Sequence, residues 1–460
     1  MLKLIERKIM SQSKHDDRQN PEAGSSPGGV ISSRIPGFYK LGVDERLRTL
    51  TETMKLSPSE VDLLGSGCLT VEQANHMVEN VVGTYSLPLG LGLNFQVNGR
   101  DYLVPMCVEE PSVIAAASNA ARMVREGGGF VAEADPPLMI AQVQLYDVPD
   151  TELGTQAILA EKESLIAACN EAQPNLLKRG GGTRDIEVRT LENSTETQPG
   201  MLVVHLIVDC CDAMGANLVN TVAEAVAARL AELSGGCFGL RILTNLADRR
   251  CVRVRCRVPL SVLRSERFDG MAVRDGIVLA SRFAELDPYR AATHNKGIMN
   301  GIDPVVLATG NDWRGVEAGA HAFAARSGVY RPLAIWRAGD DGLLHGQIEL
   351  PMAIGTVGGT LRVHPGARLG LQILGVKSAT ELGMVMASVG LASNLAALRA
   401  LAAEGIQQGH MSLHARSVAV AAGASGAMVD LVAAELAKLG DVRKERAEQI
   451  LSQLREGAGS

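Results

Sequence analysis

Residues 137–249 constrain the fold most strongly, because strand-like and helix-like segments alternate within this one stretch. Residues 138–148 have the pattern of a strand, residues 152–171 that of a helix, and residues 201–211 (MLVVHLIVDCC) that of a buried strand. After the last strand, apolar residues recur at helical spacing, at Leu218, Val222, Val226, Leu230 and Leu233. The pattern predicts a small α+β domain inserted into a larger one.

Local signals place further elements before this stretch. Thr70 can cap a helix over residues 71–82. The pair Asn98-Gly99 between two apolar runs is a strong hairpin signal. An Ala-rich helix is expected over residues 113–125, and the last part of the chain has helical character with charged ends.

Length and composition limit the class of protein. The chain has 460 residues, of which 46% are apolar, and this is enough for roughly two to three domains. A formal net charge of −6 argues against nucleic acid or an anionic membrane as the main partner. The uncharged stretch Leu382–Leu398 contains Gly, Ser and Asn, so a core helix explains it better than a membrane span.

The N-terminus and the cysteines indicate a cytoplasmic protein. Residues 1–30 are polar, are predicted to be disordered, and lack the apolar run of a signal peptide. No two cysteines form a C-x-x-C pair, and most lie inside apolar runs. We therefore expect reduced, buried thiols at Cys68, Cys107, Cys169, Cys210, Cys211, Cys237, Cys251 and Cys256.

Two neighbouring runs, residues 294–303 (HNKGIMNGID) and 308–314 (ATGNDWR), carry the most informative chemistry. Lys296 lies among Gly, Asn, Met and Ile, where little solvent would let it stabilise negative charge on a substrate oxygen. Asp312 is either an ordinary turn residue or the group that holds Lys296 and Glu110 in register. Glu110 is either a solvated carboxylate at the start of a helix or a buried general acid among apolar neighbours.

The turn Asp212–Asn217 (DAMGAN) joins the buried strand to the long helix. Asp212 can cap that helix, and the free N–H groups of the helix could bind a pyrophosphate, although most turns of this kind are simply tight turns. The pattern is not the G-x-G-x-x-G of a Rossmann site. A nearby group of arginines either forms a solvated strand face or faces phosphates: Arg249, Arg250, Arg253, Arg255 and Arg257.

Two histidines and one cysteine leave alternatives open. His410 and His414 have the spacing of a helical metal chelate, but no third ligand is evident, so no metal site is expected. A structural role, or proton donation to a departing thiolate, remains for His410. Cys107 has no histidine near it in the sequence, which disfavours it as a nucleophile.

Together these runs resemble one family, 3-hydroxy-3-methylglutaryl-CoA (HMG-CoA) reductase in its bacterial class II form, over roughly residues 33–445. The runs that carry the resemblance include residues 79–90 (ENVVGTYSLPLG), 104–118 (VPMCVEEPSVIAAAS), 205–217 (HLIVDCCDAMGAN), 287–304 (DPYRAATHNKGIMNGIDP) and 405–416 (GIQQGHMSLHAR).

The resemblance implies interconversion of HMG-CoA and (R)-mevalonate plus CoA, with two hydride transfers from or to a nicotinamide cofactor. Glu110 would protonate the substrate oxygen, Lys296 would stabilise it, and Asp312 would link the two. His410 would protonate the leaving CoA thiolate. The substrate would be held by Ser112, Asn245, Arg290, Thr293 and Asn300, and the dinucleotide by Asp212, Met214, Gly215, Ala216 and Asn217.

The resemblance also implies an α+β fold and a homodimer, or a higher oligomer of dimers, with the active site at the subunit interface. A large, mainly helical domain for substrate and CoA would comprise residues 31–136 and 250–405. Residues 137–249 would form the small, non-Rossmann dinucleotide domain, and residues 406–460 a helical C-terminal flap.

The choice of coenzyme stays open between NAD and NADP, with a slight preference for NAD. Gln173 stands where NAD-using members place an aspartate that bonds the ribose 2′-hydroxyl. An amide does not repel a 2′-phosphate as a carboxylate does, and the neighbouring cations Lys178 and Arg179 could attract one.

Two other classes of function are weighed against the reductase. One is an acyl-CoA transferase or lyase that works through a cysteine, and thiol alkylation would separate it from a reductase. The other is a non-catalytic protein that binds CoA or a nucleotide. It is disfavoured because the acid, lysine, aspartate and histidine positions all hold the residues that the reaction needs.

Overall fold

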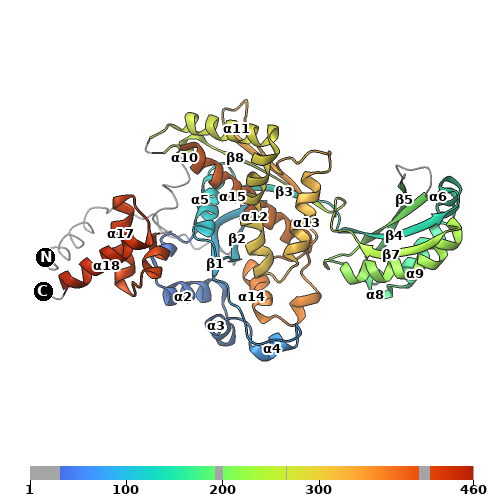
Figure 1. The fold of residues 1–460 in the computed structure, drawn as a ribbon, viewed down its shortest axis with the longest axis horizontal. Helices are drawn as coiled ribbons and strands as arrows, with labels where there is room; N and C mark the ends of the chain where they lie inside the picture. The colour runs from blue at the N-terminus through green and yellow to red at the C-terminus, as the bar shows by residue number, and fades with distance from the viewer. Residues whose placement is uncertain (1–31, 192–199, 266, 404–414, 459–460) are drawn as a thin grey trace. The chain divides into compact units, whose positions relative to one another are not determined.

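The computed structural model describes residues 32–191, 200–265, 267–403 and 415–458. Two antiparallel-rich β-sheets, each with an apolar core of its own, are surrounded by helices (Figure 1). The mixed α+β class that the sequence predicts is confirmed. The predicted disorder of residues 1–30 and the position of His410 lie outside the described residues.

The smaller sheet has four antiparallel strands in the order β5-β6-β4-β7. Its strands are β4 (Leu138–Val148), β5 (Gly182–Leu191), β6 (Gly200–Asp209) and β7 (Cys237–Leu243). Helices pack on it, with α9 along β4 and β7 (Figure 1): α6 (Thr151–Ala160), α7 (Lys162–Glu171), α8 (Pro174–Leu177) and α9 (Ala216–Ser234). Because its strands are antiparallel, this sheet is not a Rossmann sheet.

The single helix expected over residues 152–171 is wrong, because α6 and α7 are separated at Glu161. The backbone of Glu161 leaves the helical region, and its N–H donates to the carbonyls of Ile158 and Leu159. Each half buries its own apolar residue, Ile158 on α6 and Leu165 on α7.

The larger sheet has six strands in the order β2-β1-β3-β8-β10-β9. Its strands are β1 (Leu89–Val97), β2 (Arg100–Cys107), β3 (Phe130–Ala134), β8 (Cys251–Val258), β9 (Ala334–Ala338) and β10 (Leu344–Pro351). The predicted hairpin is confirmed: Asn98 (φ 50°) and Gly99 (φ 78°) join β1 to β2. Positive φ at both turn residues is the reason that Asn-Gly suits this turn.

Helices enclose the core beside this sheet, and α15 lies deepest. It packs against α12, α5 and α11 and against β8. The helices are α5 (Val113–Arg125), α10 (Leu260–Leu263), α11 (Gly270–Leu286), α12 (Pro288–Ala308), α13 (Trp313–Ala324), α14 (Pro365–Leu374) and α15 (Ala379–Ala403), with a short 3-10 turn η2 (Gly359–Arg362). α15 is long and apolar enough to cross a membrane, but most of it is buried in this core, as expected for residues 382–398.

The N-terminal part of the described chain is built from short helices. These are η1 (Phe38–Lys40), α2 (Val43–Met54), α3 (Pro58–Gly65) and α4 (Val71–Asn75). Thr70 does cap α4, but the helix expected to reach residue 82 ends at Asn75. Val78 and Val82 are exposed, so a longer helix would bury no apolar face and would gain little from packing.

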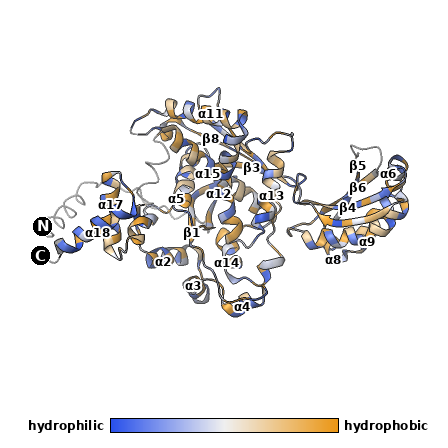
Figure 2. Cartoon of the chain, in the orientation of Figure 1, coloured by the Kyte–Doolittle hydropathy of each residue, from blue (hydrophilic) through white to orange (hydrophobic). Residues whose placement is uncertain are grey.

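The C-terminal helices α17 (Ala427–Leu439) and α18 (Lys444–Ala458) share a separate apolar cluster. Val432 and Leu436 on α17 meet Ile450 and Leu451 on α18. The other faces of α18 are mainly hydrophilic (Figure 2). The predicted helical character of this region is confirmed for the described residues, whereas the boundaries of the flap and of the inserted domain stay predictions.

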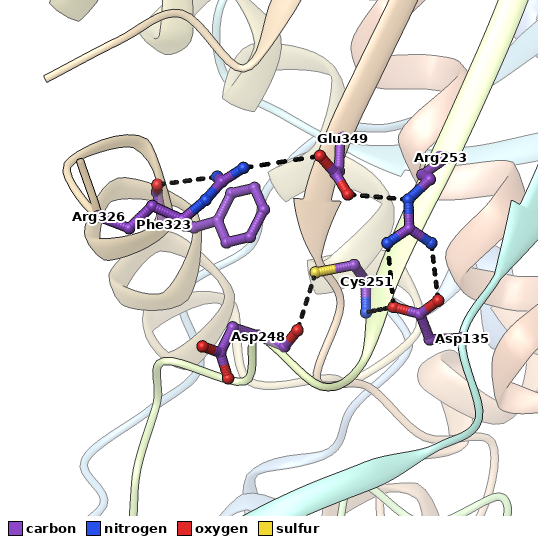
Figure 3. A network of polar contacts seen from close by, with 7 residues as sticks. All are labelled: Asp135, Asp248, Cys251, Arg253, Phe323, Arg326 and Glu349. Carbon is purple, nitrogen blue, oxygen red and sulfur yellow. Dashed lines mark hydrogen bonds and ion pairs between the residues drawn. The ribbon is translucent and has the colours of Figure 1, made fainter.

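A polar network lies where the chain passes between the two sheets (Figure 3). Asp135 follows β3, and its carboxylate accepts hydrogen bonds from the backbone N–H of Cys251 (3.2 Å) and from Arg253 (2.7 Å). Arg253 also donates to Glu349 on β10 (2.8 Å), and Arg326 lies 3.7 Å from the same carboxylate. Two connections run between the sheets, from β3 to β4 and from β7 to β8. The network holds both of them at the end that joins the larger sheet.

Candidate active site

One face of α12 carries several of the predicted site residues. Asp287 begins the helix by accepting hydrogen bonds from the N–H groups of residues 289 and 290, and Pro288 suits the first turn. Residues three or four apart share a helix face, so the site residues align at Arg290, Thr293, Lys296 and Asn300. The opposite face is buried, and this burial fixes the direction of the site face.

The structure brings Lys296, Glu110 and Asn300 into contact. The Lys296 ammonium lies 3.0 Å from Oε2 of Glu110, and Nδ2 of Asn300 lies 3.4 Å from the same oxygen. Glu110 comes from the turn between β2 and α5, and the other two come from α12. A carboxyl group, an ammonium and an amide therefore converge from segments that are distant in sequence.

The expected exclusion of solvent from this group is wrong for the single chain. The side chains of Lys296 and Glu110 are 62% and 40% exposed. Glu110 lies in a surface turn just after β2. Its apolar neighbours in sequence, Val108 and Ile114, pack against the large core and so do not shield it from water. Any dry environment for the pair must come from a ligand or another subunit.

Ser112 lies beside Glu110 in a strained backbone conformation. It precedes α5 with φ of 76°, which is uncommon for a residue other than glycine and recurs at functional sites. Its hydroxyl is buried and has no hydrogen-bond partner among the described residues. An unsatisfied buried hydroxyl costs roughly 1–3 kcal/mol, so a ligand oxygen placed there would be stabilised. Pro111 precedes this turn and is not part of α5.

Arg290 offers a cation without an acidic partner. No carboxylate among the described residues forms an ion pair with its guanidinium, and burial lowers its pKa from the ordinary value. Such a half-buried guanidinium is suited to bind a carboxylate in two-point fashion. Thr293, one turn further on, only donates a long bond to the carbonyl of Tyr289 (3.5 Å).

Asp312 and Asn245 lie together, beside α13. Asp312 caps α13 by accepting the N–H of Gly315 (3.1 Å), which is the ordinary turn role. A side chain at Gly315 would meet Oδ2 of Asp312 at 2.9 Å and Oδ1 of Asn245 at 3.3 Å. Within the described chain, Asp312 forms no hydrogen bond with Lys296 or Glu110, so their link stays a prediction.

The turn Asp212–Asn217 leaves the first turn of α9 open. α9 begins after Gly215 (φ 107°) without a side-chain cap, so its first N–H groups are free for an anion. A side chain at Gly215 would meet Sγ of Cys210 at 2.4 Å, so only glycine fits there. A 19-residue helix with an uncapped start and small residues fits the pyrophosphate of a dinucleotide.

The expectation that Asp212 caps α9 is wrong. Its Oδ1 accepts the N–H of Ala379, the first residue of α15, at 2.8 Å, and its carbonyl accepts the N–H of Thr356 at 2.9 Å. Gly215 holds the position before α9 instead. Asp212 thus ties the turn to the start of the central helix.

Arg250, which the sequence places in a group that is either a solvated strand face or faces phosphates, supports the same turn instead. It is 4% exposed and donates to the carbonyls of Ala213, Met214 and Ile354. It is therefore neither part of a solvated face nor free to face phosphates. The sequence does contain a signal for this. Every second residue of a strand faces the same side, and residues 250, 252, 254, 256 and 258 all belong to the buried side of β8 and its extension.

The other arginines of this group have different surroundings. Arg249 forms two hydrogen bonds with the carboxylate of Glu187 (3.0 and 3.1 Å). Arg253 belongs to the network of Figure 3. Arg255 and Arg257 are exposed on β8. None of these four arginines is buried, so all four fit the solvated-face interpretation.

The cysteines carry no sign of nucleophilic chemistry. All eight are free thiols, and burial raises the pKa of Cys107 to about 11. The expectation of buried thiols is confirmed for Cys169, Cys210, Cys251 and Cys256, but Cys68, Cys107 and Cys211 are partly exposed and Cys237 is exposed. In the described parts of the chain, no group of three metal-binding side chains occurs. His410 and His414 lie outside those parts.

Comparisons with known proteins identify the relatives of this chain. A profile of the family described as hydroxymethylglutaryl-coenzyme A reductase matches residues 42–415. The 3-hydroxy-3-methylglutaryl-coenzyme A reductase of Archaeoglobus fulgidus is 49% identical over 426 residues, which cover 93% of this chain and 96% of the relative. A probable enzyme of the same name from Borreliella burgdorferi is 36% identical over 75% of this chain and 77% of its own.

Solved structures agree with these relatives. The reductase of Streptococcus pneumoniae superimposes with a TM-score of 0.78 at 43% identity, covering 91% of this chain and 99% of that one. A class II reductase structure from the same organism, bound to NADPH in open conformations, gives a TM-score of 0.76 at 44% identity over 80% of this chain and 99% of that one.

Proposed function

The chain belongs to the hydroxymethylglutaryl-coenzyme A reductase family, and from that premise we propose which of its residues carry out the reaction. It is an oxidoreductase of the mevalonate pathway that interconverts HMG-CoA and mevalonate plus CoA with a nicotinamide cofactor. Reduction of a thioester to an alcohol takes four electrons, so the bound cofactor supplies two hydrides in turn.

Lys296 is the group that stabilises the substrate oxygen as negative charge develops on it. An ammonium close to a reacting carbonyl is worth several kcal/mol when it is aimed at the charge of the transition state. Glu110 supplies the proton that this oxygen finally takes. The observation that carries the proposal is the contact of Lys296 and Asn300 with one oxygen of Glu110, at 3.0 and 3.4 Å.

Asp312 is the third member of this group. It caps α13, and in the proposed arrangement it lies between Lys296 and Glu110 once the substrate and a second subunit are present. What supports this is its position on the helix that packs against α12. His410, outside the described residues, is proposed as the proton donor to the CoA thiolate on the strength of the family match alone.

Two of the groups proposed to hold the substrate, the guanidinium of Arg290 and the hydroxyl of Ser112, have no side-chain partner among the described residues. Arg290 is proposed to bind the terminal carboxylate, since no acidic side chain among the described residues neutralises it. The unsatisfied hydroxyl of Ser112 and the amide of Asn300 are proposed to bind the substrate's oxygens. Thr293 and Asn245 complete the set from α12 and from the loop after β7.

The dinucleotide is proposed to lie on the turn Asp212–Asn217, with its pyrophosphate at the start of α9. Met214, Gly215 and Ala216 present backbone there, while Arg250 supports the turn from behind. The two coenzymes differ at the 2′ position of the ribose, which carries a hydroxyl in NAD and a phosphate in NADP. We keep NAD as the slightly preferred coenzyme, with NADP as the competitor that Lys178 and Arg179 would favour.

The functional unit is proposed to be a homodimer with the site at the subunit interface and with CoA bound to the large domain. Support comes from the partial exposure of Lys296 and Glu110 in the single chain, because this chemistry works best where water is excluded. A cytoplasmic location is proposed with it.

The deciding experiment follows nicotinamide absorbance with HMG-CoA and NADH or NADPH, and then with mevalonate, CoA and the oxidised coenzymes. We expect turnover in both directions and a measurable ratio between the coenzymes. Lys178→Ala and Arg179→Ala should lower kcat/KM for NADPH and leave that for NADH unchanged. Failure to oxidise either coenzyme with HMG-CoA would refute the proposed function.

A further inference from the structure

A groove lies on the solvated face of the larger sheet. The strands β3, β8, β9 and β10 and the glycine loop between α5 and β3 line it. Its volume is about 380 Å³, which is in the range of small-molecule sites, roughly 300–1,000 Å³. None of the residues proposed for the reductase reaction contributes to its lining, so the groove needs an explanation of its own.

The alternation of side chains along β8 directs arginines into this groove. Val254 and Cys256 are buried in the core, whereas Arg255 and Arg257 are exposed on the opposite face and line the groove. Side chains two residues apart on a strand start about 7 Å from each other on the same face. The two guanidinium groups are therefore neighbours, and their solvation leaves them accessible to a ligand.

The register of the strands places further basic side chains beside Arg257. Its partner on β10 is His345, and the partner of His345 on β9 is Arg337. Residues directly opposite each other have Cβ atoms about 4.5–5.5 Å apart, and like charges at such positions are destabilising. One row of the sheet thus carries three basic groups, an arrangement that does not favour folding.

Nearby carboxylates neutralise part of this row. Glu285 accepts two hydrogen bonds from Arg337, at 2.5 and 2.7 Å. Asp341 lies 2.9 Å from Nε2 of His345. Both carboxylates are already engaged by these partners, so the charge that is left in the groove belongs to the two arginines of β8.

Arg255 and Arg257 have no acidic partner in the described parts of the chain, where no carboxylate lies within ion-pair distance of either guanidinium. The neighbours of Arg255 across the strands are Val131 on β3 and Gln347 on β10, and neither is charged. Arg253, two residues earlier on the same face, has two acidic partners instead. Two guanidinium groups without counter-charge in one groove are suited to bind a phosphate in two-point fashion.

Backbone and apolar side chains form other walls of the groove. The glycine loop lies directly on β8, because a side chain at Gly127 would meet the carbonyl oxygen of Arg257 at 1.9 Å. Gly128 has no other atom near its missing side chain, so the loop leaves the groove open. Val131, which is 56% exposed, and Ile335 add apolar surface from β3 and β9. That surface can cover the organic part of a ligand.

We propose that this groove binds a small organic phosphate, with its phosphate on Arg255 and Arg257 and its apolar part against Val131 and Ile335. The amide of Gln347, between these two sets of residues, can donate a further hydrogen bond to the phosphate. The inference goes beyond the proposed reductase function and does not depend on it, since no residue of the proposed reaction takes part. The site is additional to those proposed for CoA and the dinucleotide.

Phosphorus NMR titrations with phenyl phosphate and with inorganic phosphate test the chemistry of the ligand. The parent should bind phenyl phosphate about 10-fold or more tightly than inorganic phosphate, because only the ester has an apolar part to bury. Binding should weaken as salt is added, since the guanidinium groups are exposed. Equal affinity for the two probes would overturn the assignment of an organic ligand, and absence of binding would overturn the site.

Variants of the groove test its location. Arg255→Gln and Arg257→Gln should each weaken phenyl phosphate about 10-fold or more, because a charge-assisted two-point contact is lost. Val131→Glu places a carboxylate directly opposite Arg255 and should weaken binding in the same way. The matched control is Arg48→Gln on α2, which removes another exposed guanidinium and should bind as the parent does. Unchanged affinity in all three groove variants would overturn the proposal.

A further variant separates the groove from the proposed dinucleotide site. Gly215→Ala alters the start of α9 and should leave the affinity for phenyl phosphate unchanged. Loss of binding in Gly215→Ala, with normal binding in Arg255→Gln and Arg257→Gln, would place the phosphate at α9 and overturn the proposal. Circular dichroism and Tm verify that each variant is folded. No measurement here requires turnover of HMG-CoA, so failure of this inference is distinguishable from failure of the proposed function.

Discussion

At the scale of single residues, the group around Glu110 combines an acid and a cation that are only partly shielded. Lys296 and Glu110 are 3.0 Å apart but 62% and 40% exposed, so the pair itself adds little to stability, roughly 0–1 kcal/mol. Their proximity is therefore better explained by a role in the reaction than by a contribution to folding. Ser112, with its strained backbone and unsatisfied hydroxyl, points to the same conclusion.

Lys296→Ala is therefore expected to separate activity from folding. Turnover of HMG-CoA should fall by at least about 100-fold, because the developing negative charge loses its cation. The Tm should change little, since an exposed pair is removed. Absorbance assays and thermal unfolding measure the two effects. Full activity in this variant would exclude the proposed role of the ammonium.

Thiol modification tests the competing cysteine mechanism. Because burial raises the pKa of Cys107 to about 11, almost none of it is thiolate at neutral pH, and alkylation should begin at the exposed Cys237. We expect iodoacetamide at neutral pH to label Cys237 while HMG-CoA reduction continues. Mass spectrometry locates the label. Loss of turnover in proportion to labelling of Cys107 would favour a transferase instead.

Single residues also mark how far the sequence could predict the site. The sequence predicts that Lys296, Glu110 and Asn300 lie together, and they do. It groups Arg250 with arginines that are solvated or face phosphates, although Arg250 precedes β8 in phase with the buried face of that strand. Contacts between elements decide such groups, and a sequence pattern describes one element at a time.

At the scale of elements, prediction succeeded where the local signal was strong and a core face was present. The helix α5 and the strand β4 have the predicted bounds, because alternating or helical apolar patterns match a buried face. α4 is shorter than predicted because its continuation has nothing to pack against. The predicted cap of α9 by Asp212 failed for another reason, since α15 competes for that carboxylate.

The glycine that begins α9 offers a test at this scale. Gly215→Ala places a methyl group 2.4 Å from Sγ of Cys210 at φ 107°, so the turn must move. We expect KM for the coenzyme to rise about 10-fold or more, with a lower Tm. Gly235→Ala at the other end of the same helix is the control, because it has a positive φ but no neighbour closer than 3.7 Å.

The outcome is informative in both directions. Gly235→Ala should lose about 1 kcal/mol of stability through its backbone alone and keep the parent's KM. A Gly215→Ala enzyme with unchanged coenzyme KM would show that the start of α9 does not hold the dinucleotide. Steady-state kinetics with NADH and NADPH, and thermal unfolding of both variants, supply the comparison.

At the scale of the whole molecule, the single chain contains the reacting groups without the enclosure that their chemistry needs. The run ENVVGTYSLPLG, one of those that carry the family resemblance, is also strongly exposed: Val82 is 102% and Tyr85 93% accessible. Exposed apolar side chains of this kind promote aggregation of a monomer, whereas at a subunit interface they are buried and stabilise it. Both observations are consistent with a second copy that covers the segment and closes the site.

Activity should then depend on assembly. Val82→Glu places a charge where apolar contact is expected, and we predict a shift from dimer to monomer with loss of turnover but retained secondary structure. Val43→Glu on α2, also strongly exposed (76%) but outside that segment, is the matched control and should stay dimeric and active. Sedimentation velocity and circular dichroism, run beside the absorbance assay, distinguish the cases. A fully active monomer would mean that one chain completes its own site, and the exposure of Lys296 and Glu110 would then have to be relieved by substrate alone.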